Sequence, residues 1–106
     1  MKVDLHLHSN NSDGKFKPSE VVKRLAKSRV DFAVLTDHDS IDGSVEFAKS
    51  AARYGIKTTH GVEISASQNG IGLHILGYGI DIKDPRFKKL FKKQMAERKK
   101  KFLRAI

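Results

Sequence analysis

Six side chains of this sequence have the types and the spacing of a multinuclear metal site. They are His6, His8, Asp13, His38, Glu63 and His74. Imidazole and carboxylate groups are the ligands with which proteins hold divalent metals, and a bound metal activates water for hydrolysis. Because the sequence has no cysteine, the available ligand atoms are nitrogen and oxygen. This set suits Zn, Mn or Fe(II) and does not choose among them.

The first two histidines lie on a predicted strand near the amino terminus. Residues two apart on a strand share a face, so Asp4, His6 and His8 point one way and the apolar residues between them, with Val3, point the other. We expect the apolar face to pack against helices and the histidine face to line a cavity, as at the carboxyl end of a strand in an α/β barrel. Two histidines in this pattern are by themselves more often structural, so the other motifs carry the interpretation.

Three further strands are predicted at residues 30–36, 56–64 and 73–78. The first of these strands directly precedes His38, the second carries Glu63, and the third carries His74. Asn69-Gly70 is a type I′ turn signal, so we expect Glu63 and His74 to lie on adjacent paired strands. Helices are predicted at 18–28 and 44–54, which gives a parallel α/β pattern of alternating strands and helices.

Smaller features of these motifs also carry expectations. Asp4, Asp37 and Asp39 flank candidate ligands and could each orient an imidazole by accepting its second N–H group. Gly14 is expected to allow a backbone turn that directs the Asp13 carboxylate inward.

The net charge of +9 is concentrated at the carboxyl end of the sequence. Residues 1–82 hold 10 basic and 10 acidic residues, whereas residues 83–106 hold 11 basic and 2 acidic residues. Asp84-Pro85 has the form of a helix start and predicts a basic amphipathic helix over 84–106. Its apolar face is expected to comprise Phe87, Leu90, Phe91, Met95, Phe102, Leu103 and Ile106. The helix either packs on the domain with a solvated basic face or binds nucleic acid or an acidic membrane surface.

Four motifs resemble those of the PHP (polymerase and histidinol phosphatase) domain family, in that family's order and spacing. They are DLHLHSNNSDG at 4–14, LTDHDS at 35–40, GVEIS at 61–65 and LHILGYGID at 73–81. The resemblance covers the whole chain and implies a distorted TIM-like (β/α)7 barrel. A complete barrel takes about 250 residues. We therefore expect residues 1–106 to form the amino-terminal half of a single PHP domain.

The resemblance also implies a ligand set for up to three divalent metal ions. His6, His8 and Glu63 correspond to ligands of one metal, and Glu63 with His74 to ligands of a second metal that Glu63 bridges. Asp13 and His38 correspond to ligands of a third. The family's full set needs three more residues, a later histidine and an Asp-x-His pair, and no histidine follows His74. The nucleophile implied is a metal-bound hydroxide, with no side chain in that role.

The expected function is therefore hydrolysis of phosphate esters by a metal-dependent phosphoesterase, complete only in a longer chain. The substrate would be a small phosphorylated molecule, such as a nucleotide or another phosphomonoester. The alternative is a module without turnover that keeps half of the metal site and binds metal, or binds nucleic acid through residues 83–106. No apolar run reaches the roughly 18 residues of a membrane span, so we expect no membrane insertion and a cytoplasmic location. The oligomeric state stays open.

Overall fold

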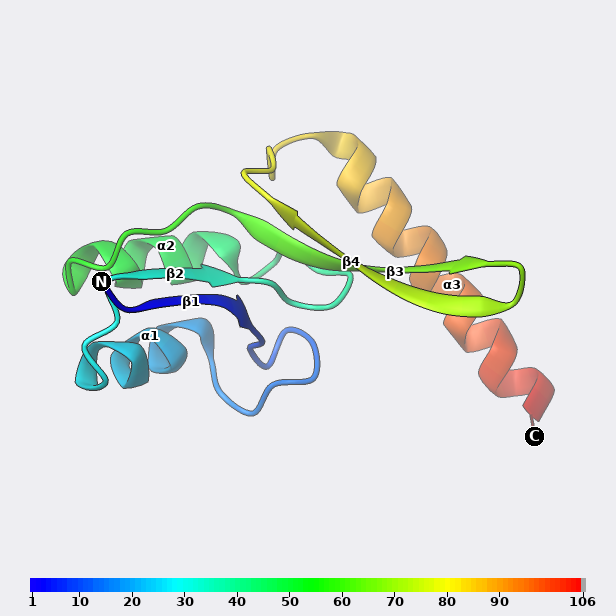
Figure 1. Ribbon diagram of the computed structural model, residues 1–106. Helices are drawn as coiled ribbons and strands as arrows, with labels where there is room; N and C mark the ends of the chain where they lie inside the picture. The colour runs from blue at the N-terminus through cyan, green and yellow to red at the C-terminus, as the bar shows by residue number, and fades with distance from the viewer. Residues whose placement is uncertain (106) are drawn as a thin grey trace.

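The computed structural model describes the backbone of residues 1–105, and the side chains of these residues except Gln68 and 101–105. It has a mixed α/β fold (Figure 1). The elements are β1 (Val3–Leu7), α1 (Pro18–Lys27), β2 (Phe32–Leu35), α2 (Ser44–Arg53), β3 (Gly61–Gln68), β4 (Ile71–Tyr78) and α3 (Pro85–Ala105). The molecule is elongated, with extents of 45 × 28 × 22 Å.

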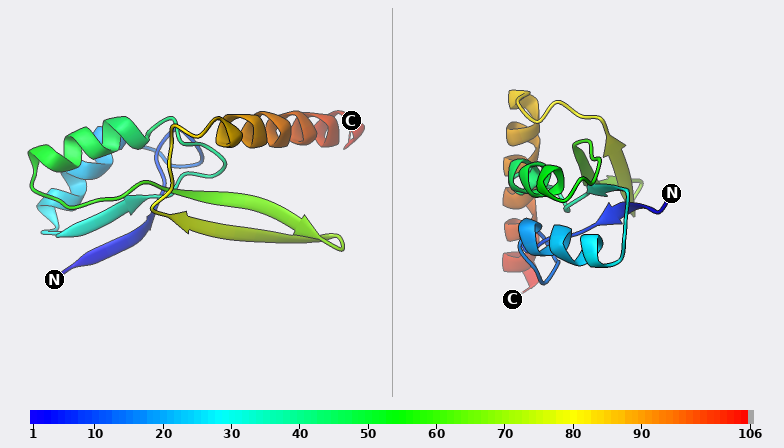
Figure 2. Two further views of the ribbon diagram at one scale, coloured as in Figure 1. Left: turned by 90° about the horizontal axis from the view of Figure 1, so that it is seen from above. Right: turned by 90° about the vertical axis from the view of Figure 1, so that its left-hand side faces the viewer.

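β1 and β2 form a parallel pair that α1 connects. Val3 lies opposite Phe32, and Leu7 lies opposite Leu35. α1 and α2 lie on the same side of this pair (Figure 2), and the apolar faces of the two helices bury the core against it. The buried core residues are Val21, Val22, Leu25, Val30, Ala33, Leu35, Phe47, Ala51 and Ile56.

The third strand is shorter at its start than expected and longer at its end. Residues 56–60 make one isolated bridge to β2, between Phe32 and Lys57, and β3 begins at Gly61. Ile56, which precedes β3, has its side chain buried in the core. A second bridge joins His38 to Glu63 in parallel orientation. The segment before β3 thus lies beside the start of β2, and β3 lies beside the residues that follow β2.

β3 and β4 form the expected hairpin. They pair in antiparallel orientation from Gly61 opposite Tyr78 to Gln68 opposite Ile71. Asn69 and Gly70 form the turn between them with φ angles of 53° and 77°, as a type I′ turn requires. The hairpin extends away from the core (Figures 1 and 2).

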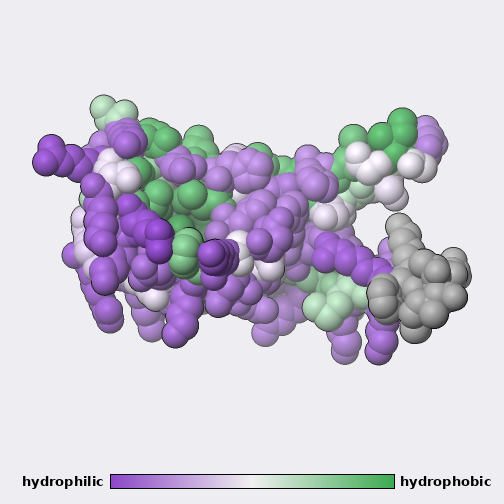
Figure 3. Space-filling view, turned by 90° about the horizontal axis from the view of Figure 1, so that it is seen from below, coloured by the Kyte–Doolittle hydropathy of each residue, from purple (hydrophilic) through white to green (hydrophobic). Residues whose placement is uncertain are grey.

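The expected packing of the apolar face of β1 is wrong for two of its three residues. Val3 and Leu5 are 47% and 42% exposed, whereas Leu7 packs against the core. Among the described residues β1 pairs with β2 alone, so its other edge has no strand partner. Figure 3 shows hydrophobic residues along this strand side of the molecule and at the tip of the hairpin.

α3 begins as the sequence predicts, because the Asp84 carboxylate accepts the backbone N–H of Arg86 at 2.9 Å. Its apolar side chains do not form one buried face, however. Phe91 is buried, whereas Leu90 and Met95 are 36% and 72% exposed. Phe102, Leu103 and Ile106 lie outside the described side chains. Among the described helices, none is both long and apolar enough to cross a bilayer.

Polar contacts from Gln94 and Arg98 hold α3 against the rest of the molecule. Gln94 donates its side-chain amide to the backbone oxygen of Ser65 at 2.6 Å, and Arg98 forms an ion pair with Asp39. α3 consequently runs beside the hairpin on the same side of the strands as α1 and α2 (Figure 2).

Candidate metal centre

The backbone places Glu63 next to the end of β2. The Glu63 N–H donates to the Asp37 oxygen at 3.0 Å, and the Glu63 oxygen accepts the Asp39 N–H at 2.9 Å. These two hydrogen bonds flank His38 and hold it level with Glu63. Residues that are 25 apart in sequence therefore lie side by side at the carboxyl ends of neighbouring strands, where α/β folds place their sites.

The buried carboxylate of Glu63 is surrounded by imidazoles. Its Oε1 lies 2.6 Å from Nε2 of His6 and 2.9 Å from Nε2 of His8. Its Oε2 lies 2.8 Å from Nδ1 of His74 and 3.5 Å from Nδ1 of His38. His74 reaches this position because it pairs with Ser65, which shares a face of β3 with Glu63. The carboxylate thus has two imidazoles at each oxygen.

This environment lowers the pKa of the Glu63 carboxyl. Burial by itself would raise the pKa, since it disfavours the charged form. The hydrogen bonds to His6 and His8 and the charges of His38 and His6 act in the opposite direction and prevail. Glu63 is therefore held as a carboxylate at neutral pH, which is the form that binds metal ions.

Asp13 completes the cluster from the loop after β1. Its Oδ1 lies 2.7 Å from Nδ1 of His8, and its Oδ2 lies 3.4 Å from Nε2 of His38. The six sequence-predicted residues thus lie in one cluster, which contains three groups with the spacing of metal ligands. The groups are His6, His8 and Glu63; His8, Asp13 and His38; and His38, Glu63 and His74.

The donor atoms fit divalent metals in type and in spacing. Nitrogen and oxygen ligands about 2.1 Å from a tetrahedral metal lie about 3.4 Å from each other. The two distances from His38 to carboxylate oxygens, 3.4 and 3.5 Å, have this value. The other pairs, at 2.6–2.9 Å, are hydrogen-bonded and need a small outward movement to admit an ion. Each group supplies three donors, fewer than the four of a closed site, which leaves positions for other ligands.

The loop that carries Asp13 is fixed by Asp37, which is 1% exposed. The Asp37 carboxylate accepts the backbone N–H and the hydroxyl of Ser9, both at 2.5 Å, and the hydroxyl of Ser12 at 2.8 Å. Gly14 closes the loop by donating to the Ser9 oxygen at 2.9 Å. A Cβ atom at Gly14 would lie 2.5 Å from the His8 oxygen, so this turn requires glycine, as the sequence suggests.

The expectation that a flanking aspartate orients an imidazole is wrong for the side-chain contacts described. Asp4 accepts a backbone N–H, and Asp37 binds the Ser9–Ser12 loop. Asp39 accepts the Ser65 N–H and pairs with Arg98. The Asp4 carboxylate is taken by the N–H of His6 on the same strand, and those of Asp37 and Asp39 are taken by donors from distant segments. Sequence reasoning missed the loop-holding role of Asp37 and the contact of Arg98.

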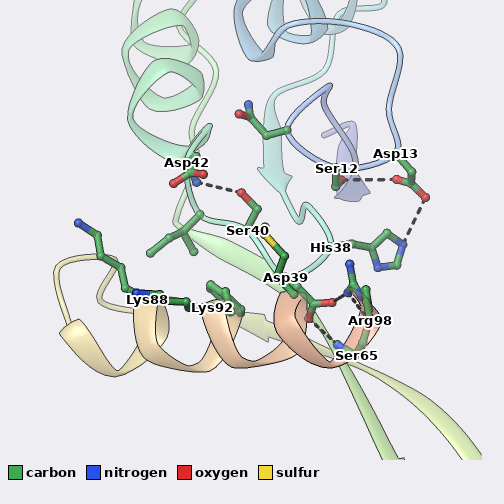
Figure 4. Close-up of a pocket in the computed structure, with 14 residues that line it drawn as sticks. Ser12, Asp13, His38, Asp39, Ser40, Asp42, Ser65, Lys88, Lys92 and Arg98 are labelled. Carbon is green, nitrogen blue, oxygen red and sulfur yellow. Dashed lines mark hydrogen bonds and ion pairs between the residues drawn. The ribbon is translucent and has the colours of Figure 1, made fainter. Parts of the chain in front are cut away.

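A cavity of about 800 Å³ opens beside the cluster, between the loops and α3 (Figure 4). Asp13 and His38 line it from the cluster, and Lys88, Lys92 and Arg98 line it from α3. The volume lies in the range of small-molecule sites. The cluster thus adjoins a space large enough for an organic ligand.

The chain matches one family over nearly its whole length. The sequence profile of the PHP domain matches residues 4–104. A 3′,5′-nucleoside bisphosphate phosphatase of Chromobacterium violaceum is 46% identical over 83 residues, which are 78% of this chain and 29% of that protein. A 5′-3′ exoribonuclease of Haemophilus influenzae is 41% identical over 99 residues, which are 93% of this chain and 36% of that protein.

Solved structures share the fold. A structure described as an amidohydrolase from Chromobacterium violaceum superimposes with a TM-score of 0.84 at 42% identity, covering 88% of this chain and 33% of that chain. A protein from Bifidobacterium adolescentis superimposes with a TM-score of 0.83 at 24% identity over 90% of this chain. The chain spans about a third of the length of the relatives it matches.

Proposed function

The chain belongs to the PHP domain family, and on that premise we propose that it carries part of the active site of a metal-dependent phosphoesterase that acts on nucleotides. The observation that carries the proposal is the arrangement around Glu63, one buried carboxylate with an imidazole nitrogen from four histidines within 3.5 Å. The relatives named as a bisphosphate phosphatase and an exoribonuclease support a nucleotide or an RNA end as substrate.

The proposed ligands are the six clustered residues. His6, His8 and Glu63 would hold one divalent ion, and Glu63 would share a second ion with His74. Asp13 and His38 would hold a third ion. His8 also lies beside this position, because its Nδ1 is 2.7 Å from Oδ1 of Asp13. An imidazole ordinarily gives one nitrogen to one metal, so His8 and His38, whose two nitrogens face different carboxylates, must each serve one group.

Divalent ions bound at such a cluster lower the pKa of water to near neutrality and neutralise phosphate charge. The protein's own part is to bind and to orient. Glu63 remains ionised, because its pKa is lowered, and it offers one oxygen to each side of the cluster. His6 and His74 are more than half exposed. The donor set favours Mn, Zn or Fe(II).

We propose that the fold is the amino-terminal part of a TIM-like barrel. Parallel β1 and β2, with α1 and α2 on one side, have the form of barrel units. The unpaired edge of β1 and the exposed Val3 and Leu5 are positions where further strands would pack. The solved structures that the chain matches are about three times as long as the matched part, which supports this assignment.

The test is hydrolysis by the full-length gene product that carries residues 1–106. We expect phosphate release from nucleotides that depends on added Mn²⁺ and is lost in Glu63→Gln and in His38→Ala. His60→Ala is the matched control, because His60 belongs to none of the three groups. Absence of metal-dependent release from a panel of phosphomonoesters and diesters, with folded protein that binds Mn²⁺, would refute hydrolysis and leave a binding role.

A further inference from the structure

The cavity beside the metal cluster continues along α3 to two lysines. Figure 4 shows Asp13 and His38 at one end and Lys88 and Lys92 at the other. Both lysine side chains belong to exposed residues one helical turn apart. Their ammonium groups therefore form the solvent-facing end of the same space that the candidate ligands border.

These two lysines supply the free positive charge of the cavity. The ion pairs of α3 among the described residues are Arg86 with Asp84 and Arg98 with Asp39, so the charge of Arg98 is already balanced. Asp42 also lines the cavity and offsets one of the two lysine charges. The remaining acidic residue of the wall, Asp13, lies at the cluster end, so one positive charge remains at the lysine end and favours an anionic group there.

The wall of the cavity also includes apolar side chains, from Ile41, Phe91 and Met95. Phe91 lies on α3 between Lys88 and Arg98. An apolar wall with polar groups at both ends is the arrangement that a ligand with an apolar body and two polar ends requires. A nucleoside that carries two phosphates has this form.

Lys88 lies too far along α3 from the cluster end for one phosphate to contact both. At a rise of 1.5 Å per residue, Lys92 and Lys88 precede Arg98 along the helix axis by roughly 9 and 15 Å. Arg98 pairs with Asp39, the neighbour of His38, and so marks the cluster end. An anion at the lysines must therefore be a different group from an anion at the cluster.

We propose that Lys88 and Lys92 bind a second phosphate of a nucleotide whose first phosphate lies at the metal cluster. The inference rests on the proposed function for the position of the first phosphate. The second phosphate could be the terminal group of a nucleoside 3′,5′-bisphosphate or the next phosphodiester of a short oligonucleotide. The lysines recognise the chemistry that these two share, a phosphate one nucleoside away from the reacting one.

The experiment compares Lys88→Ala/Lys92→Ala with the control pair Lys89→Ala/Lys99→Ala in the full-length protein. The control residues are exposed lysines of α3 that do not line the cavity, so both variants lose the same charge. The substrates are adenosine 5′-monophosphate, adenosine 3′-monophosphate, adenosine 3′,5′-bisphosphate and a 5′-phosphorylated diadenosine dinucleotide, each with Mn²⁺. Circular dichroism checks that both variants are folded, as substitution at exposed positions predicts.

The cavity pair should lower kcat/KM roughly tenfold for substrates with two phosphates, mainly by raising KM. The monophosphates and the control pair should change less than about twofold. A loss confined to the bisphosphate or to the dinucleotide would support the site and identify the source of its phosphate. Equal losses on monophosphates and bisphosphates, or equal losses in both variants, would overturn the inference while hydrolysis stands.

Binding of adenosine 3′,5′-bisphosphate in excess EDTA separates this inference from the proposed function. Without metal no metal-dependent turnover occurs, so titration calorimetry measures how strongly the lysine end of the cavity contributes to binding of the bisphosphate. Weaker binding by the cavity pair alone would support the second-phosphate site even if no substrate is hydrolysed. Equal binding by the wild type and both variants would overturn it, whatever the outcome of the hydrolysis assay.

Discussion

Ser9 gives both its backbone N–H and its hydroxyl to the carboxylate of Asp37, across 28 positions of sequence. The two residues are almost completely buried, and Ser12 adds a third hydrogen bond to the same carboxylate. This contact ties the loop after β1 to the end of β2. The loop carries His8 at its start and Asp13 near its end, so the position of two candidate ligands depends on a residue that binds no metal in our proposal.

Asp37→Asn tests this relationship, because it keeps the shape of the side chain and removes its charge. The amide nitrogen cannot accept the hydrogen bonds that one carboxylate oxygen now accepts. We expect the free energy of unfolding in urea to fall by about 2–3 kcal/mol. Asp42→Asn, at an exposed carboxylate, should change it by less than about 0.5 kcal/mol. A change in Asp37→Asn no larger than in this control would contradict the proposed role.

Glu63→Gln should remove most of the stabilisation that added metal gives. Ions that bind the folded protein alone raise its melting temperature by mass action, and Glu63 takes part in two of the three ligand groups. We expect a rise in melting temperature with Mn²⁺ for the wild type, and a much smaller rise for Glu63→Gln, in which the group of His8, Asp13 and His38 is kept. EDTA should remove the rise in the wild type. A full rise in the variant would show that the ions bind elsewhere.

The lowered pKa of Glu63 predicts how metal-free stability depends on pH. A carboxyl whose folded pKa is below its ordinary value of 4.5 stabilises the folded state above that value. It loses this contribution as pH falls through the lowered pKa. The free energy difference between the wild type and Glu63→Gln should therefore shrink as the pH falls below about 4.5. A difference that grew on acidification would contradict the direction of the shift. Urea denaturation in EDTA between pH 3 and 7 measures it.

Gly14→Ala should disturb the ligand loop, because the added Cβ would lie 2.5 Å from the His8 oxygen and 2.7 Å from the Ser9 oxygen. Backbone atoms cannot yield as a flexible side chain does. We expect a loss of about 1–3 kcal/mol in stability and weaker Mn²⁺ binding. Gly72→Ala is the matched control, since a Cβ there meets no atom within 4 Å. Equal effects of the two substitutions on metal affinity would refute the explanation.

The sequence predicted those parts of the site that depend on local rules. The period of two along a strand put His6 and His8 on one face, and Asn69-Gly70 joined Glu63 to His74 through a hairpin. These patterns depend on neighbours in the chain, and the structure places all six side chains together. Packing depends on what lies across from a residue. Val3 and Leu5 have the pattern of buried residues, yet they are 47% and 42% exposed.

The roles of the flanking aspartates could not be predicted for the same reason. Asp37 and Asp39 follow β2 in the same short motif and carry the same functional group. One faces the Ser9–Ser12 loop, and the other faces β3 and Arg98. Their partners are 25 to 59 positions away, and no local pattern specifies contacts at that separation.

The candidate metal site and the tip of the β3–β4 hairpin lie in different parts of the hairpin. Glu63 and His74 are fixed by the pairing of Ser65 with His74, and three more residue pairs follow before the turn. Insertion or deletion of matched residues beyond Ser65 and His74 would lengthen or shorten both arms together and leave the register of the site intact. One extra residue in a single arm between Glu63 and His74 would instead turn the imidazole to the opposite face. Length variation in this family should therefore be tolerated at the tip in balanced steps.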